Sequence, residues 1–140
     1  MPTERVGDPA IEDSDELWRC VHVKQLEHDP QSGLWRTQLG TFIDRNTGEL
    51  SVDVARRTTL EAVRSRRPGK SIVAVTAAAF RRLGYRVCSD PVPADNADRL
   101  SANPAHAVIC PKITTAHARE LATQHAVWVY LDSPAPQNNR

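Results

Sequence analysis

The chain has 140 residues, of which 40% are hydrophobic and 25% are charged, and its formal net charge is +1. This length suits a single domain with its own core, and the composition argues against disorder throughout. The small net charge excludes a global field that would attract nucleic acid or an anionic membrane. We expect no membrane association, because no apolar run approaches the roughly 18 residues that a spanning helix needs.

The two ends of the sequence differ from its middle. Residues 1–15 are rich in acidic side chains, and residues 133–140 contain two prolines and no apolar anchor. Both are expected to be flexible, which leaves residues 16–132 as a single domain. The N-terminal stretch lacks the basic start and apolar centre of a secretory signal, and the three cysteines form no CxxC pair. These features predict a cytoplasmic protein with free thiols.

The first half of the domain has the pattern of β-structure. Residues 17–24 alternate as a strand does, with a helical turn started by Ser14 as the alternative. A second extended segment is expected over residues 34–43. Residues 44–48 end in Gly48 and predict a tight turn. Residues 50–54 alternate clearly between apolar and polar side chains, which predicts a strand with one buried face.

The second half predicts short helices between strands. Thr58 or Thr59, Thr76 and Thr114 can each cap the start of a helix. These helices should end near residues 66, 83 and 124, and Gly84 suits the left-handed position after the second of them. Strands are expected at 71–75, 85–88, 105–110 and 126–131. The predicted fold class is α+β, with one mixed sheet and two to three short helices packed mainly on one face.

Four stretches of the sequence carry a resemblance. They are Leu17-Trp-Arg-x-x-His22, Phe42 followed by Leu50-Ser-Val52, Ala74-Val-Thr-Ala-x-x-x-Arg81-x-Leu-Gly84, and Asp90-Pro-x-Pro93 followed by Asn103-Pro-Ala-His-Ala107. In this order they resemble a family of small, uncharacterised bacterial proteins, over residues 17–131. The resemblance implies one compact domain, a bacterial origin and an association with accessory or conflict-type systems. It implies no reaction, ligand or cofactor, so no site residues follow from it.

His22 and His106 are the strongest catalytic candidates. Each lies in an apolar, strand-like stretch, where an imidazole can act as a general acid or base near neutral pH. Arg19 could assist them, with Ser51, Asp53 or Thr76 nearby. The alternative is that each histidine is structural and bonds to the backbone. We expect the structural role, since nothing in the spacing shows that the two rings meet.

A metal site is a weaker hypothesis. Cys20 and His22 would share one side of a strand, as would His106 and Cys110. If the two strands were neighbours, the four residues could hold zinc. The spacing is not that of a known zinc motif, however, so neither a metal nor a cofactor is predicted.

The middle of the chain is strongly basic. Residues 56–86 contain nine basic side chains and one acidic one, Glu61, which gives a local charge of +8. The basic residues are Arg56, Arg57, Arg64, Arg66, Arg67, Lys70, Arg81, Arg82 and Arg86. They could bind nucleic-acid phosphates or an acidic protein partner, or form a solvated surface docked on the acidic N-terminus of the chain itself.

These observations give three functional hypotheses. The first is a non-enzymatic protein-interaction module, because the chain has an acidic N-terminus, a basic middle and no catalytic signature. The second is nucleic-acid binding through residues 56–86. The third is a small enzyme or toxin that uses His22 and His106. The sequence leaves the partner and the oligomeric state open.

Overall fold

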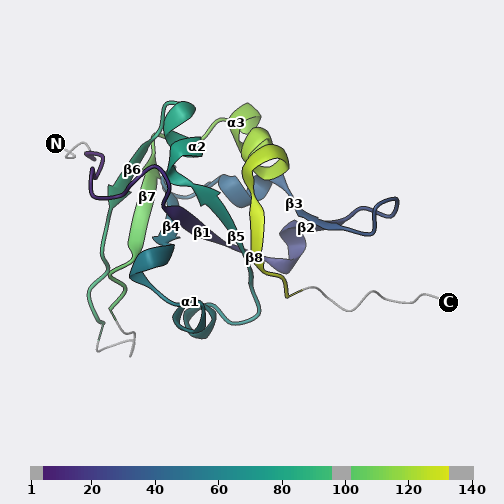
Figure 1. The fold of residues 1–140 in the computed structure, drawn as a ribbon, viewed down its shortest axis with the longest axis horizontal. Helices are drawn as coiled ribbons and strands as arrows, with labels where there is room; N and C mark the ends of the chain where they lie inside the picture. The colour runs from purple at the N-terminus through teal and green to yellow at the C-terminus, as the bar shows by residue number, and fades with distance from the viewer. Residues whose placement is uncertain (1–4, 96–101, 133–140) are drawn as a thin grey trace.

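The computed structural model describes residues 5–95 and 102–132. In this part of the chain, six strands form one sheet in the order β6-β7-β4-β1-β5-β8, and two more form a small hairpin (Figure 1). All five pairings in the large sheet are antiparallel. Its strands are β1 (Glu16–Val21), β4 (Leu50–Val54), β5 (Ser71–Thr76), β6 (Arg86–Ser89), β7 (His106–Cys110) and β8 (Val127–Tyr130). The hairpin pairs β2 (Leu26–His28) with β3 (Trp35–Thr37).

Threonine side chains begin all three α-helices of the described residues. Thr59 caps α1 (Leu60–Arg66), Thr76 caps α2 (Ala77–Arg82) and Thr114 caps α3 (Thr115–Glu120), each by accepting a hydrogen bond from a backbone N–H. The capping oxygen satisfies a donor that has no partner inside the helix. Gly84 follows α2 with φ of 94°, a conformation that a glycine adopts without strain. The predicted helix starts and the predicted role of Gly84 are confirmed.

Shorter helical turns complete the described elements. Three are 3₁₀ turns, and the fourth is a π-helical turn that continues α3. They are η1 (Val23–Gln25), η2 (Leu39–Phe42), η3 (Ala55–Arg57) and η4 (Leu121–His125). No helix in the described part of the chain has the length and apolar character needed to cross a membrane.

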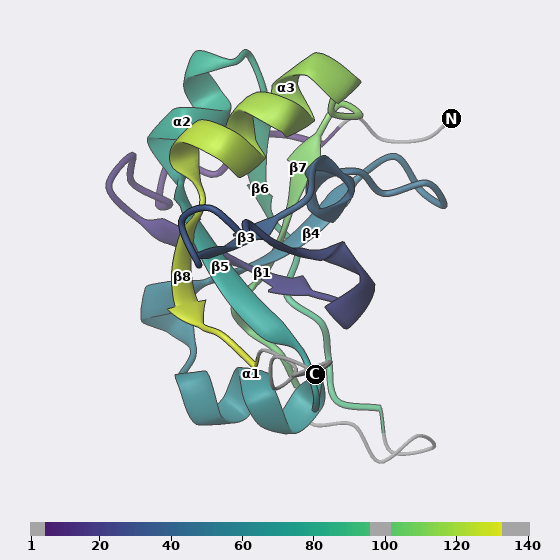
Figure 2. The ribbon, with the colours of Figure 1, turned by 90° about the vertical axis from the view of Figure 1, so that its right-hand side faces the viewer.

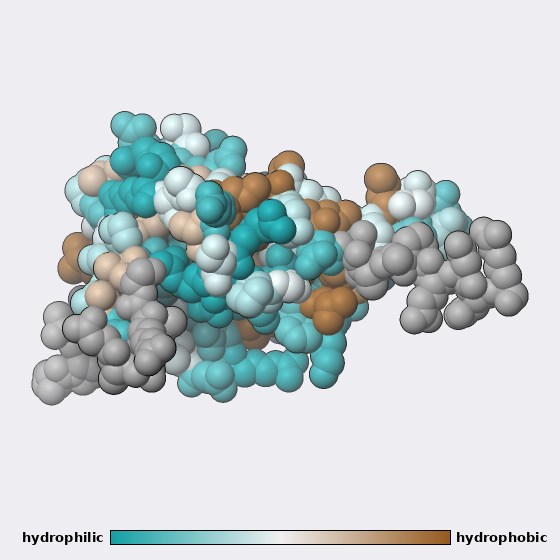
Figure 3. All heavy atoms as spheres, turned by 90° about the horizontal axis from the view of Figure 1, so that it is seen from below, coloured by the Kyte–Doolittle hydropathy of each residue, from teal (hydrophilic) through white to brown (hydrophobic). Residues whose placement is uncertain are grey.

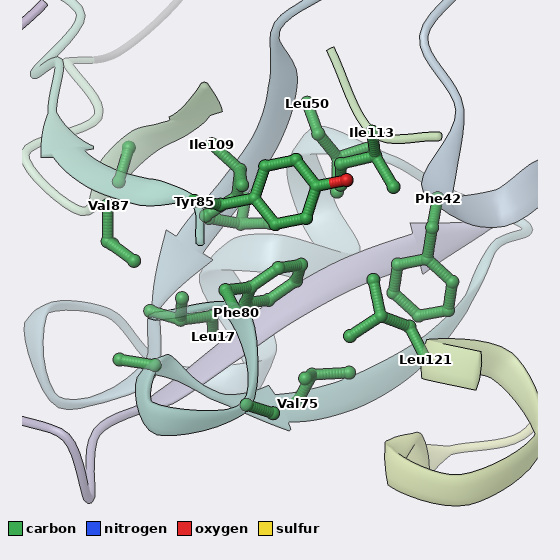
Figure 4. Close-up of a cluster of buried hydrophobic side chains, with 14 of the residues drawn as sticks. Leu17, Phe42, Leu50, Val75, Phe80, Tyr85, Val87, Ile109, Ile113 and Leu121 are labelled. Carbon is green, nitrogen blue, oxygen red and sulfur yellow. The ribbon is translucent and has the colours of Figure 1, made fainter. Parts of the chain in front are cut away.

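The main core lies between one face of the large sheet and the elements α2, α3 and η4. Leu17 and Val75 extend from the sheet toward Phe80 of α2 and Leu121 of η4 (Figure 4). All four side chains are buried. The ring of Phe80 meets that of Phe42 edge-on, with centroids 6.5 Å apart. Such aromatic contacts favour a single packing arrangement of this layer.

The helix α1 lies on the opposite side of the sheet from α2 and α3 (Figures 1 and 2). Its Val63 is buried, and so are Ile72 and Ala74 of β5, which alternate with the core residues Val73 and Val75. We conclude that α1 covers the β5 side of the second face, because Ile72 and Ala74 point away from the main core. The β4 and β7 side of this face is left for the cleft described below.

The predicted α+β class, with a single domain, one main sheet and short helices, is confirmed. The sheet is antiparallel throughout its described pairings, whereas a mixed sheet was predicted. Residues 17–24 divide into β1 and η1, so the strand forms and the alternative turn from Ser14 does not. The extended segment expected over 34–43 likewise divides, into β3 and η2.

The N-terminal segment was expected to be flexible over residues 1–15, but residues 5–15 are packed against the domain. Ile11 is part of the main core and is only 1% exposed. Backbone hydrogen bonds join Asp8 N to Val87 O and Ala78 N to Asp13 O. A single buried isoleucine in an acidic stretch gives little periodic signal, which explains why the sequence pattern missed this contact. Residues 1–4 and the predicted tail at 133–140 lie outside the described residues.

Candidate functional site

Three neighbouring strands place Trp18, Asp53 and His106 in one row across the sheet. Trp18 of β1 is the cross-strand partner of Asp53 in β4, and Asp53 is the partner of His106 in β7. Cross-strand partners share a face, and this is the face opposite the main core. The three residues line a cleft of about 190 Å³, which Arg66 and Lys70 also line.

The cleft brings the two candidate histidines, His22 and His106, to one place. Arg19 borders the cleft as well, but its side chain alternates with Trp18 and so belongs to the other face. Its guanidinium donates to the backbone oxygens of Thr41 and Ser51, at 2.8 and 2.9 Å. Burial lowers the pKa of Arg19, although a guanidinium stays charged at neutral pH. Arg19 therefore joins β1 to η2 and β4.

His106 has a defined tautomer. Its Nδ1 lies 2.8 Å from the backbone oxygen of Asp90 and 3.3 Å from Oδ2 of the same residue. Both of these atoms are acceptors, so Nδ1 carries a hydrogen, and in the neutral ring Nε2 holds the lone pair. The second carboxylate oxygen of Asp90 accepts from Arg5 Nη1 at 3.1 Å. Asp90 thus fixes the imidazole with Nε2 as the proton acceptor.

His22 has the complementary tautomer. Its Nδ1 accepts from the backbone N–H of Lys24 at 3.0 Å, and the backbone N–H of His22 donates to Gln25 Oε1 at 3.1 Å. The two bonds form a capping box at the start of η1. The neutral ring therefore carries its hydrogen on Nε2. His22 has a structural role in this turn and offers a hydrogen-bond donor at the edge of the cleft.

The loop before His106 is fastened to β4 by Asn103. The amide of Asn103 donates to Asp53 Oδ1 at 2.9 Å, and its oxygen accepts from the N–H of Ala105 at 3.2 Å. Asn103 is only 6% exposed, so both bonds are sheltered from water. The Asn103-Pro-Ala-His106 stretch thus sets the position of the His106 ring.

The basic side chains of residues 56–86 include one group that pairs with the N-terminal segment and another that lines the cleft. Arg56, Arg57 and Arg81 pair with the acidic N-terminal segment: Arg56 Nε lies 2.8 Å from Asp15, and Arg81 Nη1 lies 2.7 Å from Asp13. The hydrogen bond from Arg56 holds the pKa of Asp15 below its usual value. This part of the basic segment is therefore docked on the chain's own N-terminus, which was one of the interpretations left open.

The second group faces the surface on the α1 side. Arg66, Arg67 and Lys70 line the cleft, where Asp53 is the lining carboxylate among the described residues. Without Arg19, whose guanidinium belongs to the other face, these three cations against one anion give a local excess of +2. Hydrophilic side chains dominate the view of the molecule from this side (Figure 3). Arg82 is exposed on α2, on the opposite side of the sheet.

A wider hollow of about 660 Å³ adjoins the cleft, because Arg67 and Lys70 line both. Its lining includes Tyr130 of β8, and the guanidinium of Arg64 lies 4.1 Å from the centre of the tyrosine ring. Two carboxylates, from Glu61 and Asp132, also line this hollow. The cationic character is therefore greatest in the cleft and along its border with the hollow.

Cys20, His22 and His106 line the cleft, but the fourth candidate metal ligand, Cys110, does not. β4 lies between β1, which holds Cys20, and β7, which holds Cys110. Cys110 packs with Cys88 and Val108, and burial raises the pKa of its thiol to about 12. Within the described residues, no group of three or more His, Cys, Asp or Glu side chains could hold a metal ion. The condition that the two strands be neighbours is thus not met.

Sequence reasoning missed three residues around the cleft. Trp18 and Asn103 lay within quoted motifs without an assigned role, and Asp90 has no sequence relation to His106 that would reveal the contact. Comparison of the chain with known proteins adds no further assignment. No protein-family model, curated protein or solved structure matches it.

Proposed function

We propose that the cleft binds the backbone and bases of single-stranded nucleic acid. The observation that supports this most directly is the convergence of Arg66, Arg67 and Lys70 on a cleft that Trp18 also lines. Guanidinium and ammonium groups bind phosphate, and aromatic rings stack on bases of any sequence. Asp53, the carboxylate of the cleft, is already engaged by Asn103.

The adjoining hollow supports a strand rather than a single nucleotide. Tyr130 is the cross-strand partner of Ile72, and Trp18 is the partner of Ala74, so both rings belong to the same face. Their strands are two positions apart in the sheet, with β5 between them. From the spacing of strands and residues, the backbones at Trp18 and Tyr130 lie about 12 Å apart. Arg67 and Lys70 line both hollows and can bind the phosphates between two stacked bases.

The internal pairing of charges bears on the interaction-module hypothesis. Its motivation was the contrast between an acidic N-terminus and a basic middle. Arg56, Arg57 and Arg81 meet Asp8, Asp13 and Asp15 within the same chain. Because these basic side chains already pair with acidic residues of the same chain, they give no reason to expect an acidic protein partner.

The test is fluorescence anisotropy with a labelled, all-deoxy single strand of about 12 nucleotides, titrated at several salt concentrations. The logarithm of the association constant should fall linearly with the logarithm of the salt concentration. The slope should be about −0.7 for each phosphate contact. Arg67→Ala with Lys70→Ala should weaken binding about tenfold or more and reduce the slope by about 1.4. Trp18→Ala should cost about 1–3 kcal/mol of binding free energy.

Arg82→Ala is the matched control, since Arg82 belongs to the same basic segment but lies on the other side of the sheet. It should leave the affinity unchanged. The proposal fails if the Arg67 and Lys70 double variant binds as tightly as the wild type, or if Arg82→Ala weakens binding equally.

A further inference from the structure

We infer that the cleft cleaves RNA, with His106 as the general base; this rests on the proposed binding of a single strand there. The geometric basis is the Asp90–His106 pair. Asp90 accepts the hydrogen bond that Nδ1–H donates, so Nε2 is the basic nitrogen of the neutral ring. His106 lines the cleft while its Nδ1 edge is turned to Asp90, which leaves Nε2 as the edge available to a bound strand.

The ring is held from more than one side. The His106 side chain is 17% exposed, so it is sheltered yet reachable. Asn103 binds the preceding loop to Asp53, and Arg5 binds the far oxygen of Asp90. A base held by partners of this kind is more effective than a mobile one, because its orientation is fixed before the substrate binds. Arg66 also contacts this loop, because its Nη2 donates to Ala102 O at 3.2 Å.

RNA is the substrate that this arrangement suits, because it contains its own nucleophile. His106 Nε2 takes the proton of a ribose 2′-hydroxyl. The 2′-oxygen then forms a bond to the adjacent phosphorus, and the bond from phosphorus to the 5′-oxygen breaks. The departing 5′-oxygen takes a proton from water, and the resulting hydroxide takes the proton from His106. The products are a 2′,3′-cyclic phosphate and a 5′-hydroxyl, and the imidazole is regenerated.

The cations of the cleft assist this reaction electrostatically. The non-bridging phosphate oxygens gain negative charge as the 2′-oxygen adds to the phosphorus, and positioned guanidinium groups stabilise that charge. Arg66 and Arg67 line the cleft and are the groups placed to do so. His22 can donate its Nε2 hydrogen to a phosphate oxygen, which makes it a binding residue rather than an acid. As a positioned general base, His106 should accelerate the cleavage about 10²- to 10⁴-fold.

The experiment uses the full chain and two labelled strands that differ in one position. One strand is all-deoxy, and the other has a single ribonucleotide at its centre. The wild type should bind both and cleave only the second, with a 2′,3′-cyclic phosphate identified by mass spectrometry. His106→Ala should lower the cleavage rate at least about 100-fold. The variant should still bind the all-deoxy strand, with a loss of affinity far smaller than its loss of rate, and added imidazole should restore part of the rate.

Two further arms keep the test decisive. A 2′-O-methyl group at the central ribose should abolish cleavage by the wild type, and this result does not depend on the folding of any variant. His106→Gln, purified in the same way, repeats the loss with a polar side chain in place and controls for a contaminating nuclease.

The outcomes separate the two proposals. If the wild type binds the all-deoxy strand but leaves the ribonucleotide intact, cleavage is refuted and the binding proposal stands. Equal cleavage by His106→Ala and the wild type refutes the role of His106. Failure to bind the all-deoxy strand at low salt refutes the binding proposal, and the cleavage inference with it.

Discussion

Asp53 and His106 are cross-strand partners at the end of β4 and the start of β7, and the carboxylate of Asp53 is held there by Asn103. This relationship links the loop before β7 to the row of side chains that forms the cleft. The loop and the cleft should therefore respond together when Asn103 is changed.

The first prediction concerns Asn103. Asn103→Ala removes two sheltered hydrogen bonds and leaves Asp53 without its donor, so the free energy of unfolding should fall by about 1–3 kcal/mol. Thermal and urea unfolding would measure this. The control is Asn46→Ala, at an exposed turn position, which should change the stability by less than about 0.5 kcal/mol. A loss no greater than that of the control would contradict the assigned role of Asn103.

Much of this fold follows from local patterns, but the cleft does not. Thr59, Thr76 and Thr114 each act on the next few residues, so their capping roles are readable from the sequence. The pairing of β1 with β4, and of β4 with β7, depends on contacts between distant segments. The row of Trp18, Asp53 and His106 exists only after that order is set, and alternation alone could not supply it. The two histidines were therefore recognisable as candidates, while their common cleft was not.

The second prediction concerns α1. Val63 is its buried residue and is 1% exposed. Val63→Ala should destabilise the protein by about 1–3 kcal/mol through lost burial and a small cavity. The end of α1 positions Arg66, a cation of the cleft. A loosened α1 should therefore also weaken binding of the all-deoxy strand several-fold. Val6→Ala, at a residue 79% exposed, is the matched change and should alter neither property. Unchanged binding in a measurably destabilised Val63→Ala protein would show that α1 does not position the cations.

The third prediction is a loss of stability in acid. A hydrogen bond from Ser89 lowers the pKa of Asp8, and one from Arg56 lowers the pKa of Asp15. A carboxyl whose pKa is lower in the folded state stabilises the protein above the unfolded value of about 4. That contribution is lost as the pH falls through the folded value. Urea unfolding should therefore show a decline below about pH 4 that is smaller in Asp15→Asn.

The matched control for Asp15→Asn is Glu27→Gln, which changes an exposed carboxylate of β2 outside the N-terminal segment. It should keep the pH dependence of the wild type. If Asp15→Asn keeps the same dependence as well, the ion pair with Arg56 does not fasten the N-terminal segment in solution.

The fourth prediction concerns the thiols. Burial is the main cause that raises the pKa of Cys110 to about 12, and it also raises the pKa of Cys20. The variant with Cys20→Ala and Cys88→Ala loses the part of the Cys110 pKa shift that Cys88 causes, but burial remains. Its Cys110 should therefore react with a disulfide reagent at pH 8 at least about tenfold more slowly than a free thiol. In concentrated urea it should react at the rate of a free thiol. Fast labelling of the folded protein would show that the structure around Cys110 opens readily.

The last prediction concerns Arg5, whose guanidinium binds both Asp90 and Glu49. The pair with Glu49 has an Nε–Oε2 distance of 2.8 Å, and that with Asp90 an Nη1–Oδ1 distance of 3.1 Å. Surface ion pairs contribute at most about 1 kcal/mol, so Arg5→Ala should change the free energy of unfolding only slightly. Removing Arg5 frees the carboxylate that faces His106, so cleavage of the ribonucleotide strand should slow several-fold. Arg45→Ala, at an exposed arginine of the turn before β4, should leave the rate unchanged. If Arg5→Ala cleaves as fast as Arg45→Ala, the backbone oxygen of Asp90 alone suffices to hold the His106 ring.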